Sequence, residues 1–316
     1  MLAASSALVP AAAAAPVPAP SALQAQVVSV VKRVEPSVVQ IETGSGLGSG
    51  VILDDSGHIV TNAHVVGTSK SVKVTLHNGK RYTGRVIDAF TANDIAVVKI
   101  SAPNLRPIQV ASSAGLQVGQ FALAVGNPLG LRSSVTFGIV SALNRTVTEE
   151  TGAAIPRTIQ TSAPINPGNS GGALVDIQGR LIGIPTLAAS DPQMGGAAVG
   201  IGFAIPSDTV KDLAGQIIKY GKVVNSHRAF VGIGAGDTGG QGVYVGSVQP
   251  GSPAAKAGIQ TGDIIRSIAG RLTPTTAALS EALVALKPGQ TVTVVVVRPN
   301  GEKKSVKLTL ASYPGS

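Results

Sequence analysis

Short apolar runs separated by glycine-rich turns fill most of the chain between residues 38 and 204. Runs of about four to eight aliphatic or β-branched residues between turn residues are typical of β-strands. The first set of predicted strands covers 38–42, 50–53, 59–62, 72–76, 83–88 and 95–100, and the second covers 121–126, 135–142, 158–161, 173–176, 181–184 and 200–204. Two sets of about six strands predict a mainly β fold with two β-barrels.

Helical patterns stand on both sides of these strands. Residues 22–34 are largely apolar and stop before Pro36, as a helix does ahead of a proline. Pro206 and Ser207 open a second helix that runs to about Tyr220, with Gly221 as its C-terminal cap.

The residue pattern in the last part of the chain predicts a separate α+β unit. Its strands are expected at 230–233, 243–248, 263–268, 291–298 and 303–310, and a helix at 276–286 carries Leu279, Leu283 and Leu286 on one face. We therefore divide the chain into an N-terminal segment (1–25), a barrel domain (26–222) and a C-terminal domain (227–312).

The pentapeptide 168–172, Gly-Asn-Ser-Gly-Gly, is the strongest chemical signal. A serine on a tight glycine turn exposes its hydroxyl, and backbone N–H groups can converge beside it as an oxyanion hole. His64 and Asp94, each at the edge of a predicted strand, supply a general base and an orienting carboxylate. The order His64, Asp94, Ser170 is that of chymotrypsin-like proteases, whereas α/β-hydrolases and subtilisins use other orders. The two barrels would then meet at the site.

Composition removes several alternatives. The chain has no cysteine, and its four histidines lack the His-x-x-x-His spacing of zinc hydrolases, so we expect no metal and no cofactor. The net charge is +9, but the basic residues are scattered along the chain and are not interleaved with aromatic residues. This distribution argues against nucleic acid as a partner. The glycine-rich stretch 44–50 is not followed by Gly-Lys-Ser/Thr, which argues against nucleotide binding.

The first 20 residues are rich in alanine and proline. Pro10 ends their first apolar run after nine residues, which is too short to span a bilayer. We interpret the segment as the remnant of a signal peptide or membrane anchor, with a flexible spacer as the alternative.

The ordered motifs together resemble the HtrA/Deg family of serine proteases with a C-terminal PDZ domain. The motifs that carry the likeness lie at 61–66, 94–99, 124–128, 135–142, 165–174, 200–206, 230–233, 251–258 and 262–265. The resemblance implies a chymotrypsin-like double six-stranded β-barrel followed by an α+β PDZ domain. It also implies degradation of unfolded or damaged proteins outside the cytoplasm, in the periplasm, the cell envelope or a secreted form, by homo-trimers or larger homo-oligomers without cofactor or metal.

Position by position, the resemblance makes Ser170 the nucleophile, His64 the general base and Asp94 its partner. It assigns the oxyanion hole to the N–H groups of Gly168 and Ser170 together with Asn169. The substrate pocket is expected around Pro164, Ile165, Thr186 and Leu187. The PDZ domain is expected to bind hydrophobic C-terminal peptides at Phe230, Val231, Gly232 and Ile233. The alternative is a purely structural role, in which Gly232 only permits a strand bend.

Two segments depart from the family pattern. Thr161-Ser162-Ala163-Pro164 stands where Thr-Asp-Ala-Ala is common, and Pro185 stands where asparagine is usual. These departures concern the specificity pocket rather than the triad. The competing functional hypotheses are a non-enzymatic PDZ-bearing holdase or scaffold, and an esterase, which the order of the triad residues disfavours.

Overall fold

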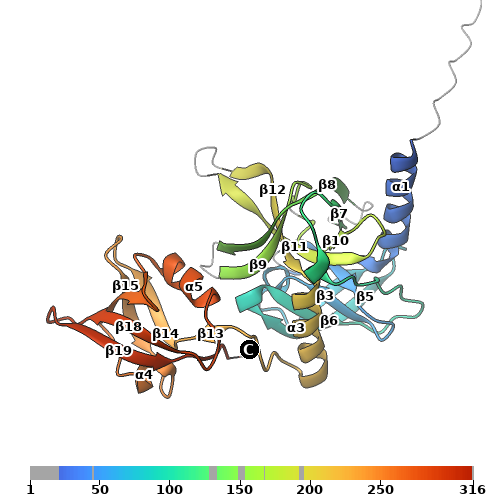
Figure 1. The fold of residues 1–316 in the computed structure, drawn as a ribbon. Helices are drawn as coiled ribbons and strands as arrows, with labels where there is room; N and C mark the ends of the chain where they lie inside the picture. Colours follow the sequence, from blue (N-terminus) through green and yellow to red (C-terminus); the bar gives the residue numbers. More distant parts are fainter. Residues whose placement is uncertain are drawn as a thin grey trace, which may run out of the picture.

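A computed structural model describes residues 21–44, 46–127, 134–148, 154–166, 168–191 and 196–314 (Figure 1). Of residues 148, 154, 187–191 and 196–199 only the backbone is described. Segment 1–20, interpreted above as a signal remnant or spacer, lies outside the described residues. Within the described part, no helix is both long and apolar enough to cross a membrane.

The first predicted barrel is confirmed. Its strands close in the order β1-β2-β3-β6-β5-β4. They are β1 (Val38–Glu42), β2 (Leu47–Ile52), β3 (His58–Thr61), β4 (Ser71–Thr75), β5 (Arg81–Phe90) and β6 (Ile95–Lys99). Alternate residues such as Val39, Ile41 and Ile59 fill its interior with no exposed surface, so burial of aliphatic side chains holds the strands in register.

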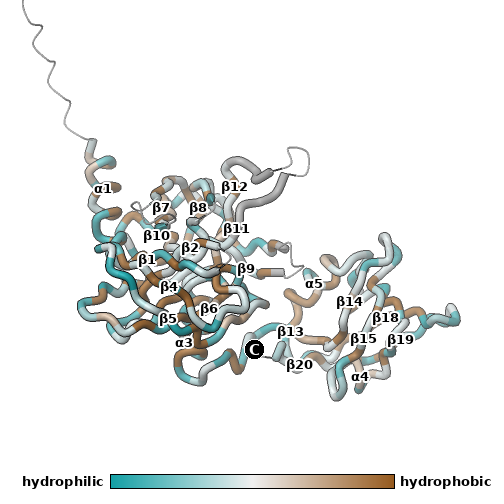
Figure 2. The backbone as a smooth tube through the Cα atoms, turned by 180° about the vertical axis from the view of Figure 1, so that it is seen from behind, coloured by the Kyte–Doolittle hydropathy of each residue, from teal (hydrophilic) through white to brown (hydrophobic). Residues whose placement is uncertain are grey.

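The second barrel is also confirmed and closes in the order β10-β11-β12-β9-β8-β7. Its strands are β7 (Phe121–Gly126), β8 (Ser134–Thr148), β9 (Ala154–Thr161), β10 (Ala173–Val175), β11 (Leu181–Asp191) and β12 (Gly196–Pro206). β11 and β12 continue well beyond the predicted 181–184 and 200–204. Figure 2 shows apolar stretches along the strands of the barrels and polar residues at many turns.

Helices and short 3-10 turns complete the barrel domain. α1 (Ala22–Val34) buries Val30 and Val34 and crosses the boundary that we placed at residue 25. α3 (Ser207–Tyr220) ends at the predicted cap, Gly221, whose φ is 77°. The remaining elements are α2 (Ala63–Val66), η1 (Glu35–Ser37), η2 (Thr91–Asn93) and η3 (Ser113–Gly115).

The C-terminal domain has a sheet in the order β14-β15-β16-β18-β19, with β17 paired to β16. The strands are β14 (Ile233–Asp237), β15 (Val243–Val248), β16 (Ile264–Ile268), β17 (Arg271–Leu272), β18 (Thr291–Val297) and β19 (Lys303–Thr309), and the helices are α4 (Pro253–Lys256) and α5 (Thr276–Val284). A separate pair joins β13 (Ala229–Phe230) to β20 (Ala311–Ser312).

One predicted strand of this domain is wrong. Residues 230–233 do not form a single strand, because β13 ends at Phe230 and β14 begins at Ile233. Gly232, with φ of 84°, breaks the extended backbone between them. The segment is therefore a turn between two different sheets.

Candidate active site

His64 lies in the first barrel, on the single-turn helix α2 directly after β3. Its ring Nδ1 is 2.9 Å from Asp94 Oδ2, and its backbone N–H donates to Asp94 Oδ1 at 3.0 Å. A carboxylate on Nδ1 favours the tautomer that carries the proton there, which leaves Nε2 without a proton, as a general base requires. The imidazole is partly open to solvent, with 44% of the side chain exposed, so a substrate can reach it.

Asp94 follows η2 in a left-handed backbone conformation, with φ of 52° and ψ of 43°. The residue is 1% exposed. Besides the two donors from His64, its Oδ2 accepts the Thr186 hydroxyl at 2.5 Å, and its backbone carbonyl accepts Asn62 Nδ2 at 3.0 Å. With these donors fixed around it, the Asp94 carboxylate can orient an imidazole and stabilise its protonated form.

Ser170 lies on the predicted tight turn, between Gly168 and Gly171, which both have positive φ. A Cβ at Gly171 would lie 2.2 Å from Ser49 O and 2.3 Å from Thr61 Oγ1, so only glycine fits between the barrels here. Ser49, from β2, also donates its N–H to Ser170 O at 2.9 Å. The serine turn of the second barrel is thereby fixed against the first.

Thr186, on β11, joins the two halves of the site. Its hydroxyl binds Asp94, and its carbonyl accepts the hydroxyl of Ser170 at 3.1 Å. The structure thus brings His64, Asp94 and Ser170 into one hydrogen-bonded network through Thr186. Sequence reasoning placed Thr186 at the substrate pocket and missed this role. One feature of the sequence could have indicated this role: Thr186 lies in a predominantly apolar strand. A hydroxyl buried in such a strand needs a hydrogen-bond partner.

The three predicted oxyanion-hole residues differ in their backbone bonding. Asn169 N–H donates to Asn166 O at 3.0 Å and so closes a turn. Among the described residues, the N–H groups of Gly168 and Ser170 make no backbone or side-chain hydrogen bond. These two groups therefore remain available to a developing oxyanion, whereas the N–H of Asn169 is occupied in this structure.

Comparison with known proteins matches the chain to two domain families and to several serine proteases. Residues 48–184 match the family described as a trypsin-like peptidase domain, and residues 210–310 match the PDZ domain family. Putative serine protease HhoB of Synechocystis sp. is 39% identical over 284 residues, covering 80% of this chain and 66% of the relative. Periplasmic pH-dependent serine endoprotease DegQ of Escherichia coli strain K12 is 40% identical over 284 residues, covering 86% and 60%.

Two solved protease structures align with this chain over nearly their whole length. The serine endoprotease from Yersinia pestis has a TM-score of 0.62 and 34% identity, covering 94% of this chain and 100% of that one. The HtrA-type protease AlgW with decapeptide has a TM-score of 0.63 and 30% identity, covering 91% and 98%. This chain belongs to the HtrA family of serine proteases. It spans 60% of the length of DegQ and 66% of the length of HhoB.

The residues expected at the substrate pocket of this HtrA protein differ in exposure. Pro164 is exposed, and its carbonyl accepts Thr136 Oγ1 at 2.8 Å. Ile165 is 7% exposed and belongs to a core cluster of the second barrel. Thr186 is 2% exposed, and the side chain of Leu187 lies outside the described part.

The two departures from the HtrA pattern have local structural roles. Pro185 lies in β11 at an irregularity in its pairing with β12, where a proline is tolerated, and its carbonyl accepts the N–H of Gly171 at 3.0 Å. Ser162 Oγ accepts the N–H of Ile139 at 3.0 Å. The Pro185 carbonyl thus contacts the serine turn, whereas Ser162 ties the residue after β9 to β8.

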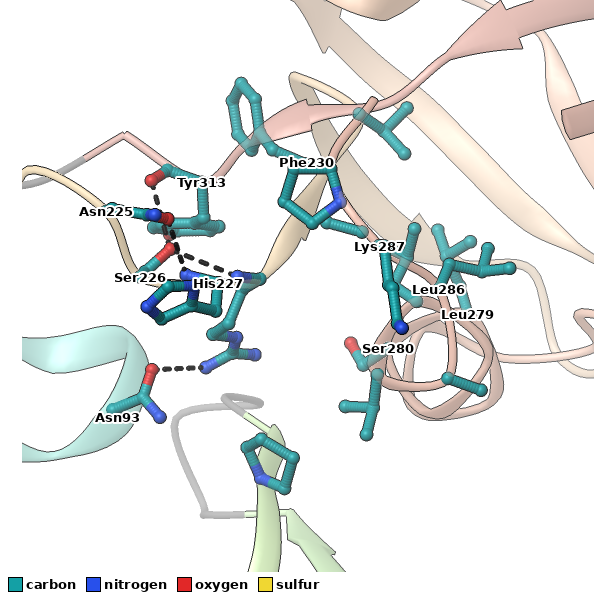
Figure 3. A pocket seen from close by; sticks show the side chains of 18 of the residues that line it. Asn93, Asn225, Ser226, His227, Phe230, Leu279, Ser280, Leu286, Lys287 and Tyr313 are labelled. Carbon is teal, nitrogen blue, oxygen red and sulfur yellow. Dashed lines mark hydrogen bonds between the residues drawn. The ribbon is translucent and has the colours of Figure 1, made fainter. Parts of the chain in front are cut away.

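The predicted PDZ peptide loop borders a pocket of about 1090 Å³. Phe230, Val231, Gly232 and Ile233 all line it, together with Leu279 of α5. Figure 3 shows Phe230 and Tyr313 on one side of this pocket, and Leu279 and Leu286 on the helical side. The other wall comes from the barrel domain and includes Asn93, Pro156 and Arg157.

Gly232 is required here for more than a strand bend. A Cβ at this position would lie 2.2 Å from the Cβ of Ser252, so a larger residue would push the loop away from α4. The carbonyl of Gly232 accepts Gln249 N–H at 3.0 Å, and that of Val231 accepts Ala254 N–H at 2.9 Å. The loop carbonyls are thus turned into the domain. Among the described residues, no group of three or more His, Cys, Asp or Glu side chains is placed to hold a metal.

Proposed function

We propose that this HtrA protein is an endopeptidase that cleaves unfolded or damaged polypeptides through a His64-Asp94-Ser170 triad. The observation that carries the proposal is the network in which Thr186 binds both Asp94 and Ser170 while Asp94 binds His64 twice. Such an arrangement suits acyl transfer, since it combines a nucleophile, a base and a residue that orients the base.

The reaction begins when the Ser170 hydroxyl turns from Thr186 O towards the imidazole of His64. Ser170 Oγ attacks the scissile carbonyl, and its proton passes to His64 Nε2 while Asp94 stabilises the imidazolium. The N–H groups of Gly168 and Ser170 stabilise the oxyanion. His64 then protonates the leaving amine, and the same groups direct water onto the acyl-enzyme, which releases the acid product and restores the serine.

The PDZ domain, in this proposal, binds a hydrophobic C-terminal peptide as an added strand beside α5. An extended peptide is held by main-chain hydrogen bonds, and its terminal carboxylate by successive N–H groups of the loop. Two observations support this: the pocket at residues 230–233, and the decapeptide that accompanies the related protease AlgW in its solved structure. No nucleic acid or cofactor enters the proposal.

The proposed setting is extracytoplasmic, because the related serine endoprotease DegQ of Escherichia coli is periplasmic. We also propose a homo-trimer or larger homo-oligomer. The exposed rings of Phe121 and Phe137, 5.2 Å apart, offer an apolar contact surface for such an assembly. Light scattering after size-exclusion chromatography would measure the assembly directly.

The test of the function uses denatured casein as substrate. Degradation should stop when a serine-directed phosphonate or fluorophosphonate is added, and peptide mapping should find the adduct on Ser170. Binding of casein without cleavage, and with no adduct on Ser170, would support the non-enzymatic holdase instead.

A further inference from the structure

Arg228, in the linker just before β13, reaches across to the turn that carries Asp94. Its Nη1 donates to the carbonyl of Ala92 and contacts Asn93 Oδ1 at 3.4 Å. Ala92 and Asn93 belong to η2, and both are buried, at 6% and 3% exposed. The guanidinium therefore binds the two residues that directly precede Asp94 in the chain.

Tyr313 holds Arg228 in this position. The guanidinium lies over the Tyr313 ring, 5.7 Å from its centroid, and the Tyr313 N–H donates to the Arg228 carbonyl at 2.8 Å. The same ring packs edge-on against Phe90 at 6.1 Å and Phe230 at 5.3 Å. Phe90 ends β5 immediately before η2. Arg228 and Tyr313 thus contact both ends of the turn that leads to Asp94.

The partners of Arg228 are unusual for a half-buried cation. Burial lowers the pKa of the guanidinium from its ordinary value, while Tyr313 opposes that shift. No carboxylate pairs with it among the described residues; it binds a carbonyl and an amide instead. A guanidinium is costly to desolvate. The hydrogen bonds that Arg228 donates to η2 therefore explain its position best.

The turn needs such support. Asp94 has a left-handed backbone, a conformation that a residue with a Cβ adopts stably only where its surroundings hold it. On one side Asn62 binds the Asp94 carbonyl. On the other side the two contacts of Arg228 fix the preceding residues. The turn is thus held from both sides, by Asn62 and by Arg228.

We propose that Arg228, seated on Tyr313, is a positioning residue that holds Asp94 in register with His64. This inference rests on the proposed function, since it assumes that Asp94 orients the general base. Arg228 and Tyr313 come from the linker and the PDZ end of the chain. Docking of that end against the barrel domain is then part of assembling the triad.

The experiment measures kcat and KM of the full chain on a fluorogenic peptide built from a mapped casein cut site. Rates are normalised to the sites titrated by a serine-directed inhibitor, so that unfolded protein does not count. Arg228→Met keeps the aliphatic stem over the ring and removes the donors. It should lower kcat by about 10- to 100-fold, the usual cost of a small misplacement in a catalytic group, with KM within about twofold.

Conservative variants separate positioning from simple packing. Arg228→Lys keeps a cation that can reach Ala92 O and should recover kcat to within about fivefold of the wild type. Tyr313→Phe keeps the ring and should stay within about twofold. The matched control is Arg271→Met, because Arg271 is exposed on β17 and the structure records no side-chain partner for it among the described residues. If Arg228→Met does not fold, Arg228→Gln gives the same test.

Asp94→Asn distinguishes the two ways in which the idea can fail. If Asp94→Asn keeps full activity, the triad assignment fails and the inference falls with it. If Asp94→Asn is inactive but Arg228→Met matches Arg271→Met in kcat, only the positioning role is wrong. A rise in KM with unchanged kcat in Arg228→Met would equally overturn it.

Discussion

Replacing Thr186 by valine removes one hydroxyl from the centre of the network and little else. Valine has nearly the same shape and the same β-branching, so β11 keeps its side-chain volume. The backbone carbonyl that accepts the Ser170 hydroxyl remains. What disappears is the 2.5 Å hydrogen bond to Asp94 Oδ2, at a position that is 2% exposed. Water cannot easily replace the lost donor.

The size of the effect follows from the charge on the acceptor. A hydrogen bond to a charged group contributes about 1.5–3 kcal/mol. Asp94 keeps its two donors from His64, so it stays placed but less well stabilised. The lost hydrogen-bond energy raises the barrier to the step in which the imidazolium forms. Each increase of about 1.4 kcal/mol in that barrier lowers the rate tenfold. We therefore expect kcat to fall by about 10- to 100-fold with little change in KM.

The assay is steady-state hydrolysis of a fluorogenic peptide, with Thr186→Ser as the matched control. Serine keeps the hydroxyl and should stay within about threefold of the wild type, because it restores the bond at the cost of one methyl group. A Thr186→Val enzyme within twofold of the wild type would refute the reasoning. It would mean that the Thr186 hydroxyl contributes nothing to the action of Asp94 and that our interpretation of the network is wrong.

Three further predictions concern stability, specificity and peptide binding. Desolvation raises the pKa of Asp208, but hydrogen bonds from residues 112–114 together lower it below its ordinary value. This stabilisation is therefore complete above about pH 4 and is lost as the pH falls through the folded-state pKa. Asp208→Asn, in the first turn of α3, should lower Tm by roughly 2 °C at pH 7, with the difference shrinking in thermal melts as the pH falls below about 4; a difference that stays constant over that range would contradict this. Cut sites mapped on denatured casein should follow Val, Ala or Leu, because Pro164 and Ile165 carry no charge, and dominant cleavage after Lys or Arg would exclude the assignment. In calorimetry with the Ser170→Ala chain, a hydrophobic peptide should bind more tightly as the free acid than as the C-terminal amide. Equal affinities would rule out carboxylate recognition.

Much of the fold follows from local pattern. Both barrels could be predicted because their strands bury continuous or alternating aliphatic residues between glycine turns. The elements that pattern did not reveal are short or atypical. α2 and α4 each have four residues, too few to show a helical period. β14 has the sequence Ile-Gly-Ala-Gly-Asp, which is poor in the residues that favour strands.

The triad residues could be identified from sequence because each lies in a recognisable motif. The residues around them could not, because their roles arise from pairs far apart in the chain. Thr186 binds Asp94 across 92 positions, and Arg228 binds Ala92 across 136. Nothing local distinguishes such a threonine or arginine from others in a strand or linker. Only the closure of the second barrel and the docking of the linker bring them to the site.

The most direct test of the account is turnover of denatured casein by the wild-type chain and by Ser170→Ala, prepared side by side. Triad residues act as a unit, so the variant should lose roughly 10⁶-fold in kcat. Its thermal melt should match the wild type, since the hydroxyl lies on a turn and makes a single recorded bond to Thr186 O within the described chain. A folded, uncontaminated Ser170→Ala protein that still degrades casein at a wild-type rate would contradict the central claim.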